Sequence, residues 1–189
     1  IWMIQSKKYD GAGKMVSMLA KFFRISLSQG KDIIPLQKEL EHAVSYLSIQ
    51  NVRFQDKFTF TVDWDEKLAD CLCPKLVIQP LLENAVYHGM EGMYEDGEIQ
   101  LKIYAVNELV HIDVIDNGEG MTEAQVQKMM QGDVVSSKRG SGIGVKNVND
   151  RIKLYFGEAY GVQIISAPDE GTTARIYFPM RRQEDETEK

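Results

Sequence analysis

The hydrophobic period of this chain changes near Lys57, and that change limits the folds the chain can adopt. Upstream, apolar residues recur every three or four positions, which is the period of an amphipathic helix. Downstream, the segment that begins at Phe58 alternates apolar and polar residues, as half-buried strands do. A helical region followed by strands mixed with helices predicts an α+β fold and not a doubly wound parallel sheet.

The upstream part predicts two helices joined by a short polar link, with no strand between them. The first helix includes the apolar residues of Met15–Ile25, and the second runs from about residue 32 to residue 50. Asp32 is the expected N-cap of the second helix, and Pro35 is tolerated in a first turn because its missing N–H has no partner there. We therefore expect residues 1–55 to form a helical hairpin or stalk.

The downstream part, residues 56–181, predicts one domain in which antiparallel strand pairs lie against helices as a two-layer sandwich. Its first helix is expected to start near Pro74, which suits the first turn of a helix. Thr122 with Gln125 three positions on is a capping box, which starts a short helix. The chain ends in a charged tail, residues 182–189, with no apolar anchor. We expect strands near 58–62, 98–106, 109–115, 162–166 and 172–178, and helices near 74–88, 122–130 and 145–156.

Composition narrows the functions open to this chain. It carries 22 Lys and Arg against 28 Asp and Glu, a formal charge of −6, which argues against a general nucleic-acid binder because such proteins carry basic patches. Its apolar runs are far shorter than the roughly 20 residues that span a bilayer. Cys71 and Cys73 are too few and too close for a disulfide framework and have no nearby pair that would complete a zinc site, so they indicate a reducing compartment.

The segment Asp116-Asn117-Gly118-Glu119-Gly120 stands at the end of an apolar strand. A carboxylate in this position is costly unless hydrogen-bond donors meet it, and the glycines allow the backbone to turn sharply and approach a flat ligand. The amino group of adenine is a suitable donor, whereas the carbonyl of guanine would set acceptor against acceptor. An ordinary Asp-Asn-Gly turn at a strand end explains this segment about equally well by itself.

A second glycine cluster, Gly140-Ser141-Gly142-Ile143-Gly144, comes directly before a helix expected to start near Val145. The backbone N–H groups at a helix N-terminus accommodate phosphate, and Lys138 and Arg139 add positive charge just upstream. The glycine spacing is not that of a Rossmann fingerprint, and no Walker A lysine is present. A flexible surface loop is the alternative interpretation.

Asn84 and His88 are four residues apart in an expected helix and therefore share one face. A carboxamide oxygen is an acceptable ligand for magnesium, which commonly takes one or two protein oxygens and fills its other positions with phosphate and water. Glu83 is rotated by about 100° from Asn84 and would act through a water molecule. For His88 alone, a packed or capping role is the more ordinary interpretation. Thr172, after Gly171, could bond adenine directly or through water, although threonine is common in strands.

These segments follow one another as Asn84, Asp116-x-Gly118-x-Gly120, Gly140-x-Gly142-x-Gly144 and Gly171-Thr172. Their order and separation resemble the N, G1 and G2 boxes and the terminal Gly-Thr of the Bergerat-fold ATP-binding domains, which include histidine kinases, gyrase B, Hsp90 and MutL. Further segments are similar to the LytS/YesM-type sensor histidine kinases, and they extend the resemblance to nearly the whole chain. These are Glu39-Leu40-Glu41, Tyr46-Leu47-Ser48-Ile49-Gln50, Gln79-Pro80-Leu81-Leu82-Glu83-Asn84-Ala85, and Gly144-Val145 with the helix that follows.

The resemblance implies the ATP-binding catalytic region of a sensor histidine kinase, whose γ-phosphoryl passes from ATP to a histidine and then to a response-regulator aspartate. It implies a homodimer in the full-length protein, no nucleic acid, and the cytoplasmic side of a cell-membrane sensor that meets the membrane only through segments before Ile1. Asn84 would bind magnesium, and Glu83 would be the second catalytic residue. The implied ATP contacts are Asn84, His88, Asp116, Gly118, Gly120, Lys138, Arg139, Gly140, Gly142, Gly144 and Thr172.

Two departures from the family pattern shape the expected activity. The gyrase, Hsp90 and anti-sigma-kinase branches carry a catalytic Glu one helical turn before the Asn, where this chain has Pro80, which favours phosphotransfer over hydrolysis. The subfamily's phosphoacceptor segment Asn-Pro-His-Phe-Leu-Phe-Asn is absent, and none of His42, His88 and His111 has its context. We expect the acceptor before Ile1, so that this chain does not autophosphorylate alone. A nucleotide-sensing or dimerisation module and a Bergerat ATPase remain the alternatives.

Overall fold

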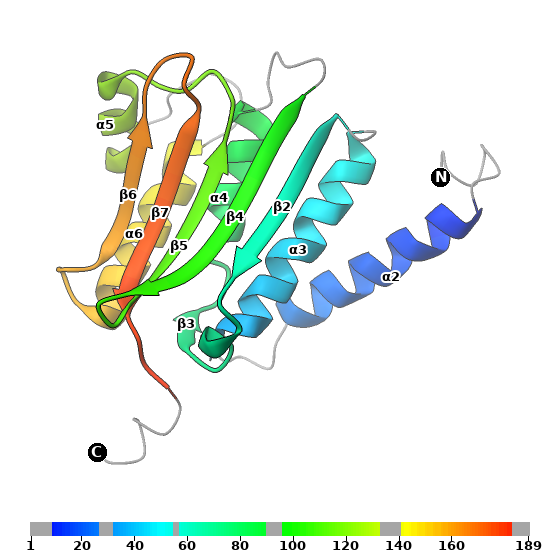
Figure 1. Cartoon of the computed structure of the whole chain (residues 1–189), viewed down its shortest axis with the longest axis horizontal. Helices are drawn as coiled ribbons and strands as arrows, with labels where there is room; N and C mark the ends of the chain where they lie inside the picture. The colour runs from blue at the N-terminus through cyan, green and yellow to red at the C-terminus, as the bar shows by residue number, and fades with distance from the viewer. Residues whose placement is uncertain (1–8, 27–31, 55–56, 90–95, 133–140, 183–189) are drawn as a thin grey trace.

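The computed structural model describes residues 9–26, 32–54, 57–89, 96–132 and 141–182 (Figure 1). The helical elements are α2 (Tyr9–Ser26), α3 (Leu36–Arg53), a 3-10 turn η1 (Glu66–Leu68), α4 (Gln79–Asn84), the π-helical η2 (Ala85–Gly89), α5 (Glu123–Gln131) and α6 (Ser141–Phe156). The strands are β1 (Ile33–Pro35), β2 (Phe58–Trp64), β3 (Leu72–Pro74), β4 (Gly97–Val106), β5 (Leu109–Asp116), β6 (Gly161–Ser166) and β7 (Thr172–Pro179).

Five of the strands form one sheet in the order β2-β4-β5-β7-β6. All neighbours are antiparallel except β2 and β4, which are parallel because the connection between them crosses over through β3, α4 and η2. The helices of the domain lie against one face of this sheet (Figure 1). The expected α+β class and two-layer sandwich are therefore confirmed, with a mixed sheet.

Alternation along the strands places the core between the sheet and its helices. In β5, Val110, Ile112 and Val114 are buried toward the helices, and the register sets Val114 between Leu101 of β4 and Ala174 of β7. The largest fully buried side chains come from the sheet and from α3, α4 and α6: Phe178, Leu36, Leu47, Leu81, Leu82, Ile99, Leu101, Ile103, Ile112 and Ile152 among them.

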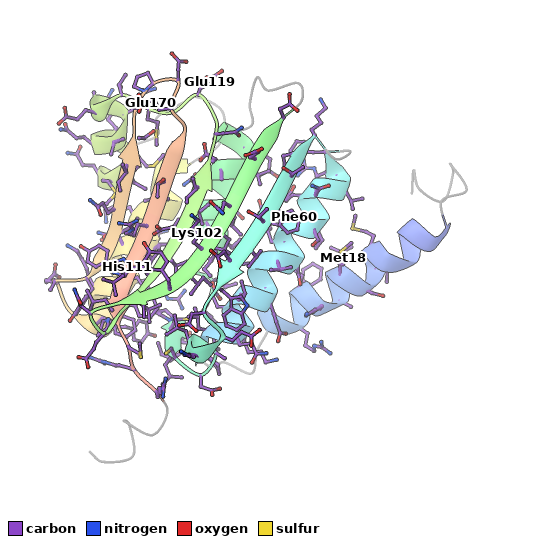
Figure 2. All side chains as sticks on the ribbon, in the orientation of Figure 1. Met18, Phe60, Lys102, His111, Glu119 and Glu170 are labelled. Carbon is purple, nitrogen blue, oxygen red and sulfur yellow. The ribbon has the colours of Figure 1, made fainter. Side chains whose placement is uncertain are left out.

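The helical hairpin is present, and its two helices differ in what they contact. Leu36, Leu47 and other buried residues of α3 belong to the same core cluster as the sheet. Helix α2 packs on α3, where the ring of Phe22 stacks on that of His42 with centroids 4.3 Å apart, and Figure 2 shows Met18 between the two helices. A domain boundary at residue 55 remains a prediction, since α3 adds to the core of the domain that follows it.

The expectation of no strand between the two helices is wrong, because β1 pairs antiparallel with β3. This pairing joins residues that are about 40 positions apart, so no local pattern indicates it. Asp32 is not the N-cap of α3, since Pro35 occupies that position without a side-chain cap. The Asp32 carboxylate instead lies 3.5 Å from the ammonium of Lys75 and 3.8 Å from the guanidinium of Arg151.

Two further boundaries differ from expectation. The helix expected from Pro74 begins at Gln79, because Pro74 ends β3. At the C-terminus, the N–H of Leu72 donates to the carbonyl of Arg181 over 2.8 Å, and Arg182 forms a bridge with Cys71. The described residues of the expected tail are thus paired with the chain near β3, while residues 183–189 lie outside the described part.

Local signals of the sequence are confirmed where they depend on near neighbours. The capping box of Thr122 and Gln125 is present at the start of α5. Asn107 and Glu108 turn β4 into β5 with φ of 50° and 64°, the left-handed pair of a tight hairpin. In the part of the chain that the structure describes, no helix is both long and apolar enough to cross a membrane.

Candidate functional site

A pocket, partly open to solvent, lies where α4, η2 and α5 meet the ends of β5, β6 and β7. Most of its wall is apolar, as is usual for small-molecule sites. Three polar side chains from distant segments face it, namely Asn84, Asp116 and Thr172. The complete lining consists of Leu81, Asn84, Ala85, Val114, Asp116, Gly120, Met121, Met129, Ile164, Thr172 and Ala174.

Asp116 ends β5 and is 8% exposed. The N–H of Gly118 donates to its carboxylate over 3.0 Å. Burial raises the pKa of Asp116 to about 6, against the opposing effect of the backbone N–H groups of Gly118 and Thr172. At neutral pH the side chain is therefore mainly ionised, and it offers a hydrogen-bond acceptor to a ligand in an otherwise apolar pocket.

Two glycines let the loop after β5 lie against the turn between β6 and β7. Gly120 has φ of 65° and Gly171 has φ of 75°. A Cβ at Gly120 would overlap the carbonyl oxygen of Ala167, and a Cβ at Gly171 would overlap the carbonyl oxygen of Asp116. Figure 2 shows Glu119 and Glu170, which precede these glycines, at the same end of the sheet. Close backbone packing thus sets the position of Asp116.

We expect Gly171→Ala to destabilise the protein by about 1–3 kcal/mol more than Gly157→Ala, because it combines a left-handed backbone with a backbone overlap. Gly157 is the matched control, since its φ is 107° but nothing lies within 4 Å of an added Cβ. Urea unfolding of both variants measures the difference. Equal midpoints and slopes for the two variants would show that the contact with Asp116 is not tight.

Asn84 is the last residue of α4, directly before the π-helical η2. Short π-helical segments are rare and occur frequently at functional sites. Glu83 is not part of the pocket wall, and its carboxylate accepts a hydrogen bond from the Gln79 amide over 2.7 Å. The structure describes the backbone of His88 at the end of η2 but not its side chain.

The second glycine cluster is described only in part. Lys138, Arg139 and Gly140 lie outside the described residues. Helix α6 starts at Ser141, four residues earlier than expected, so Gly142 and Gly144 belong to its first turn. An added Cβ at Gly144 would be 3.4 Å from Cβ of Pro80, so the start of α6 passes close to α4 beside the pocket.

Sequence reasoning missed the apolar walls of the pocket and one polar residue beside it. Met121 and Met129 line the pocket, and the only signal for Met121 was its place directly after Gly120. Ser166 of β6 accepts a hydrogen bond from the N–H of Met121 over 2.9 Å and donates to the carbonyl of Gly171 over 2.8 Å. Its hydroxyl is also 3.0 Å from that of Thr172, which orients Thr172 at the pocket wall.

The described residues contain no group of three or more His, Cys, Asp or Glu side chains that could hold a metal ion. The carboxamide oxygen of Asn84 is a suitable single ligand for magnesium, which commonly takes one or two protein oxygens and fills its other positions with phosphate and water.

Two family models match this chain. The model for "Histidine kinase-, DNA gyrase B-, and HSP90-like ATPase" matches residues 70–182, and the model "Histidine kinase" matches residues 1–58. The first range contains the whole lining of the pocket. It also contains all the predicted ATP contacts.

Relatives agree with these models. Sensor histidine kinase YesM of Bacillus subtilis is 35% identical over 96% of this chain, and sensor protein LytS of Bacillus anthracis is 32% identical over 94%. The chain spans about 30% of the length of each. The histidine kinase AdeS of Acinetobacter baumannii has the same fold, with a TM-score of 0.57, 13% identity, and coverage of 96% of this chain and 84% of its own.

The predicted motifs, the pocket that unites three of them and the two family models point to one assignment. ATP is the substrate of this type of domain. The chain belongs to the histidine kinase-, DNA gyrase B- and HSP90-like ATPase family and, within it, is the ATP-binding catalytic region of a sensor histidine kinase of the LytS/YesM type.

Proposed function

We propose that this chain binds magnesium-ATP and directs its γ-phosphoryl to a histidine outside these 189 residues, for later transfer to an aspartate of a response regulator. The observation that carries the proposal is the shared pocket of Asp116, Asn84 and Thr172, next to the first turn of α6. Asp116 offers a buried acceptor, and α4, whose Asn84 offers a carboxamide, lies close to the N-terminal turn of α6. Adenine and phosphate require these two kinds of group.

At the adenine end, Asp116 accepts a hydrogen bond from the exocyclic amino group. Thr172 adds a hydroxyl contact, direct or through water, and Ser166 orients that hydroxyl from 3.0 Å away. Gly118 and Gly120 shape the loop that carries the carboxylate, while Met121 and Met129 cover the base with apolar surface. Because Asp116 is only 8% exposed, the hydrogen bond to it discriminates adenine from guanine strongly.

At the phosphate end, Asn84 holds the cation through its carboxamide oxygen, and Glu83 acts through a water molecule next to it. When bound, magnesium neutralises charge on the phosphates and on the transferred group. The N–H groups of the first turn of α6, with Gly142 and Gly144, face the phosphates. Further proposed contacts, which come from segments or side chains outside the described part, are His88, Lys138, Arg139 and Gly140.

The residues near Asn84 favour phosphotransfer over hydrolysis. Pro80 stands one helical turn before Asn84, where a water-activating carboxylate would have to be. His42 is fully buried and stacked on Phe22, and burial lowers its pKa to about 4. His111 lies between Tyr104 and Tyr177 on the sheet face away from the pocket. Neither histidine suits the role of acceptor, so we place the acceptor in the helix upstream of Ile1.

The proposal is tested with a longer natural chain that includes the upstream helix and its histidine. With γ-labelled magnesium-ATP we expect acid-labile, base-stable phosphate on that chain, and a loss of at least tenfold for Asn84→Ala. Gln163→Ala, which removes an exposed carboxamide from β6, is the matched control and should react like the wild type. Steady-state phosphate release without labelled protein, abolished in Asn84→Ala, would instead support an ATPase. ATP binding without labelling or turnover would support a nucleotide-sensing module.

We propose two protein partners for the whole protein. A response regulator receives the phosphoryl group, and a second copy of the chain supplies or receives the reacting histidine through the helical hairpin. We propose that the catalytic region works on the cytoplasmic side and meets the membrane only through segments that precede Ile1.

A further inference from the structure

Glu39 of α3 is a fully buried carboxylate outside the nucleotide pocket. One of its oxygens accepts a hydrogen bond from the N–H of Leu76 over 2.8 Å. The other accepts from the N–H groups of Val77 and Ile78 over 2.8 and 3.0 Å. A buried carboxylate is costly, and these three donors are what makes its position tolerable.

The three donors belong to the turn that begins α4. Ile78 is the N-cap residue of α4 and provides no side-chain cap of its own. Leu76 has φ of 59°, a strained conformation for a leucine that persists only where the surroundings hold it. Glu39 therefore accepts from the N-cap residue of α4 and from the two residues before it, and so holds the turn into α4 from another helix, 37 to 39 positions earlier in the chain.

Helix α3 also holds the far end of the same helical segment. The guanidinium of Arg53 donates to the hydroxyl of Tyr87 in η2 over 2.6 Å. The rings of Phe54 and Tyr87 are in edge contact with centroids 6.0 Å apart. Asn84 lies between these two attachment points, so α3 holds the segment that carries Asn84 at both ends.

Helix α6 is attached to the same turn. The guanidinium of Arg151 donates to the carbonyl of Lys75 over 2.8 Å, and Asp32 lies within ion-pair distance of both side chains. The first turn of α6 contains Gly142 and Gly144. Residues 75–78 thus connect α3 with the two helices that border the phosphate end of the pocket.

The adenine end has separate supports. Asp116 is held by the Gly118 N–H and by the packing of Gly171 against its carbonyl, and these contacts belong to the sheet and its loops. Glu39 contacts none of them in the described hydrogen bonds. A change at Glu39 should therefore affect one end of the pocket more than the other.

We propose that Glu39 is a positioning residue for magnesium-ATP: from α3 it fixes the first turn of α4 and, through it, the carboxamide of Asn84. The inference rests on the proposed role of Asn84. Helix α3, from which Glu39 acts, packs on α2 at one edge of the domain (Figure 1).

Glu39→Gln tests the proposal in this chain, because it keeps the shape of the side chain but turns one acceptor into a donor that faces a backbone N–H. We expect magnesium-ATP to bind at least tenfold more weakly by calorimetry, while the dissociation constant of adenosine changes less than twofold. Glu41→Gln is the matched control, since Glu41 lies on the same helix and pairs only with Lys38 and Lys21 among the described ion pairs. It should bind both ligands like the wild type.

If Glu39 had a purely structural role, Glu39→Gln would weaken the binding of magnesium-ATP and of adenosine equally, or would weaken neither. Either result would overturn the proposal. In an Asn84→Ala background, Glu39→Gln should cause no further loss of magnesium-ATP affinity, and an additive loss would also contradict it. If Glu39→Gln does not fold, Glu39→Asp, which keeps the charge with a shorter reach, must show the same selective loss. Wild-type protein that binds ATP equally tightly with and without magnesium would refute the role of Asn84 itself, separately from Glu39.

Discussion

Asp116→Asn is expected to remove nucleotide binding and at the same time to stabilise the free protein. The amide would present either a donor or a weaker, neutral acceptor to the adenine amino group, at a buried position where water compensates little. We expect the dissociation constants of adenosine and ATP to rise at least 100-fold, which is about 3 kcal/mol. Isothermal titration with adenosine measures this loss without a contribution from the phosphates.

The gain in stability follows from the raised pKa of Asp116. The folded protein holds the proton up to a pKa of about 6, whereas the unfolded chain releases it near the ordinary value of 3.8. Ionisation therefore opposes folding above pH 6, by at most about 3 kcal/mol, and this opposition disappears as the pH falls toward 3.8. Asparagine removes the cost, so the variant should melt higher than the wild type at pH 8 and equally at pH 4.

Asp63→Asn is the control for both measurements, because Asp63 is an exposed carboxylate of β2. Asp63→Asn should not change adenosine binding. It should also melt at the same temperature as the wild type at both pH 8 and pH 4. Adenosine binding by Asp116→Asn within fivefold of the wild type would refute the assigned role of Asp116. An unchanged melting temperature at pH 8 would show that burial does not penalise this carboxylate.

Arg175→Met is expected to destabilise the protein by about 3 kcal/mol. Asp113 of β5 is 3% exposed although it lies opposite Lys102 in the register, on the sheet face away from the helices. Arg175 of β7 donates to its two carboxylate oxygens over 2.8 and 2.7 Å, and the hydroxyl of Tyr104 donates over 3.0 Å. Removal of the guanidinium leaves a buried charge with one neutral donor.

A loss of about 3 kcal/mol is at the low end for breaking a buried ion pair. We expect this low value because the Arg175 side chain is 28% exposed, and because Lys102, which lies opposite Asp113 in the register, brings a second positive charge to this face. Figure 2 shows Lys102 and His111 on this face of the sheet. Urea unfolding of Arg175→Met should show the loss, and the double variant with Asp113→Asn should recover more than half of it. A loss below about 1 kcal/mol for the single variant would mean that solvent already screens the pair.

The helices and strands could be predicted where short-range patterns decide them. The capping box of Thr122 and the hairpin turn at Asn107 depend on neighbours within three residues, so the sequence contains all the information needed. The order of the motifs also indicated the family, since four segments with a set order and separation are far more specific than any one of them. Asp116, Asn84 and Thr172 were identified as site residues in this way, and the structure brings all three to one pocket.

Long-range contacts could not be predicted in the same way. The pairing of β1 with β3, the parallel pairing of β2 with β4 and the start of α4 at Gln79 all depend on partners tens of residues away. The pattern after Pro74 suits a helix, but Pro74 pairs within β3, and Glu39 accepts from the N–H groups of the turn that separates β3 from α4. Hydrophobic periodicity contains no information about which distant segment will supply such a partner.

What the sequence determined by itself was therefore the class of fold, the family and the chemical type of each group in the proposed site: a carboxylate proposed for adenine, a carboxamide proposed for a cation, and glycines beside a helix proposed for phosphate. Only the tertiary structure decided how these groups are held. Burial raises the pKa of Asp116, the contact with Gly171 fixes its backbone, and Glu39 sets the turn before Asn84. These properties arise from desolvation and from hydrogen bonds between segments that meet only when the chain is folded.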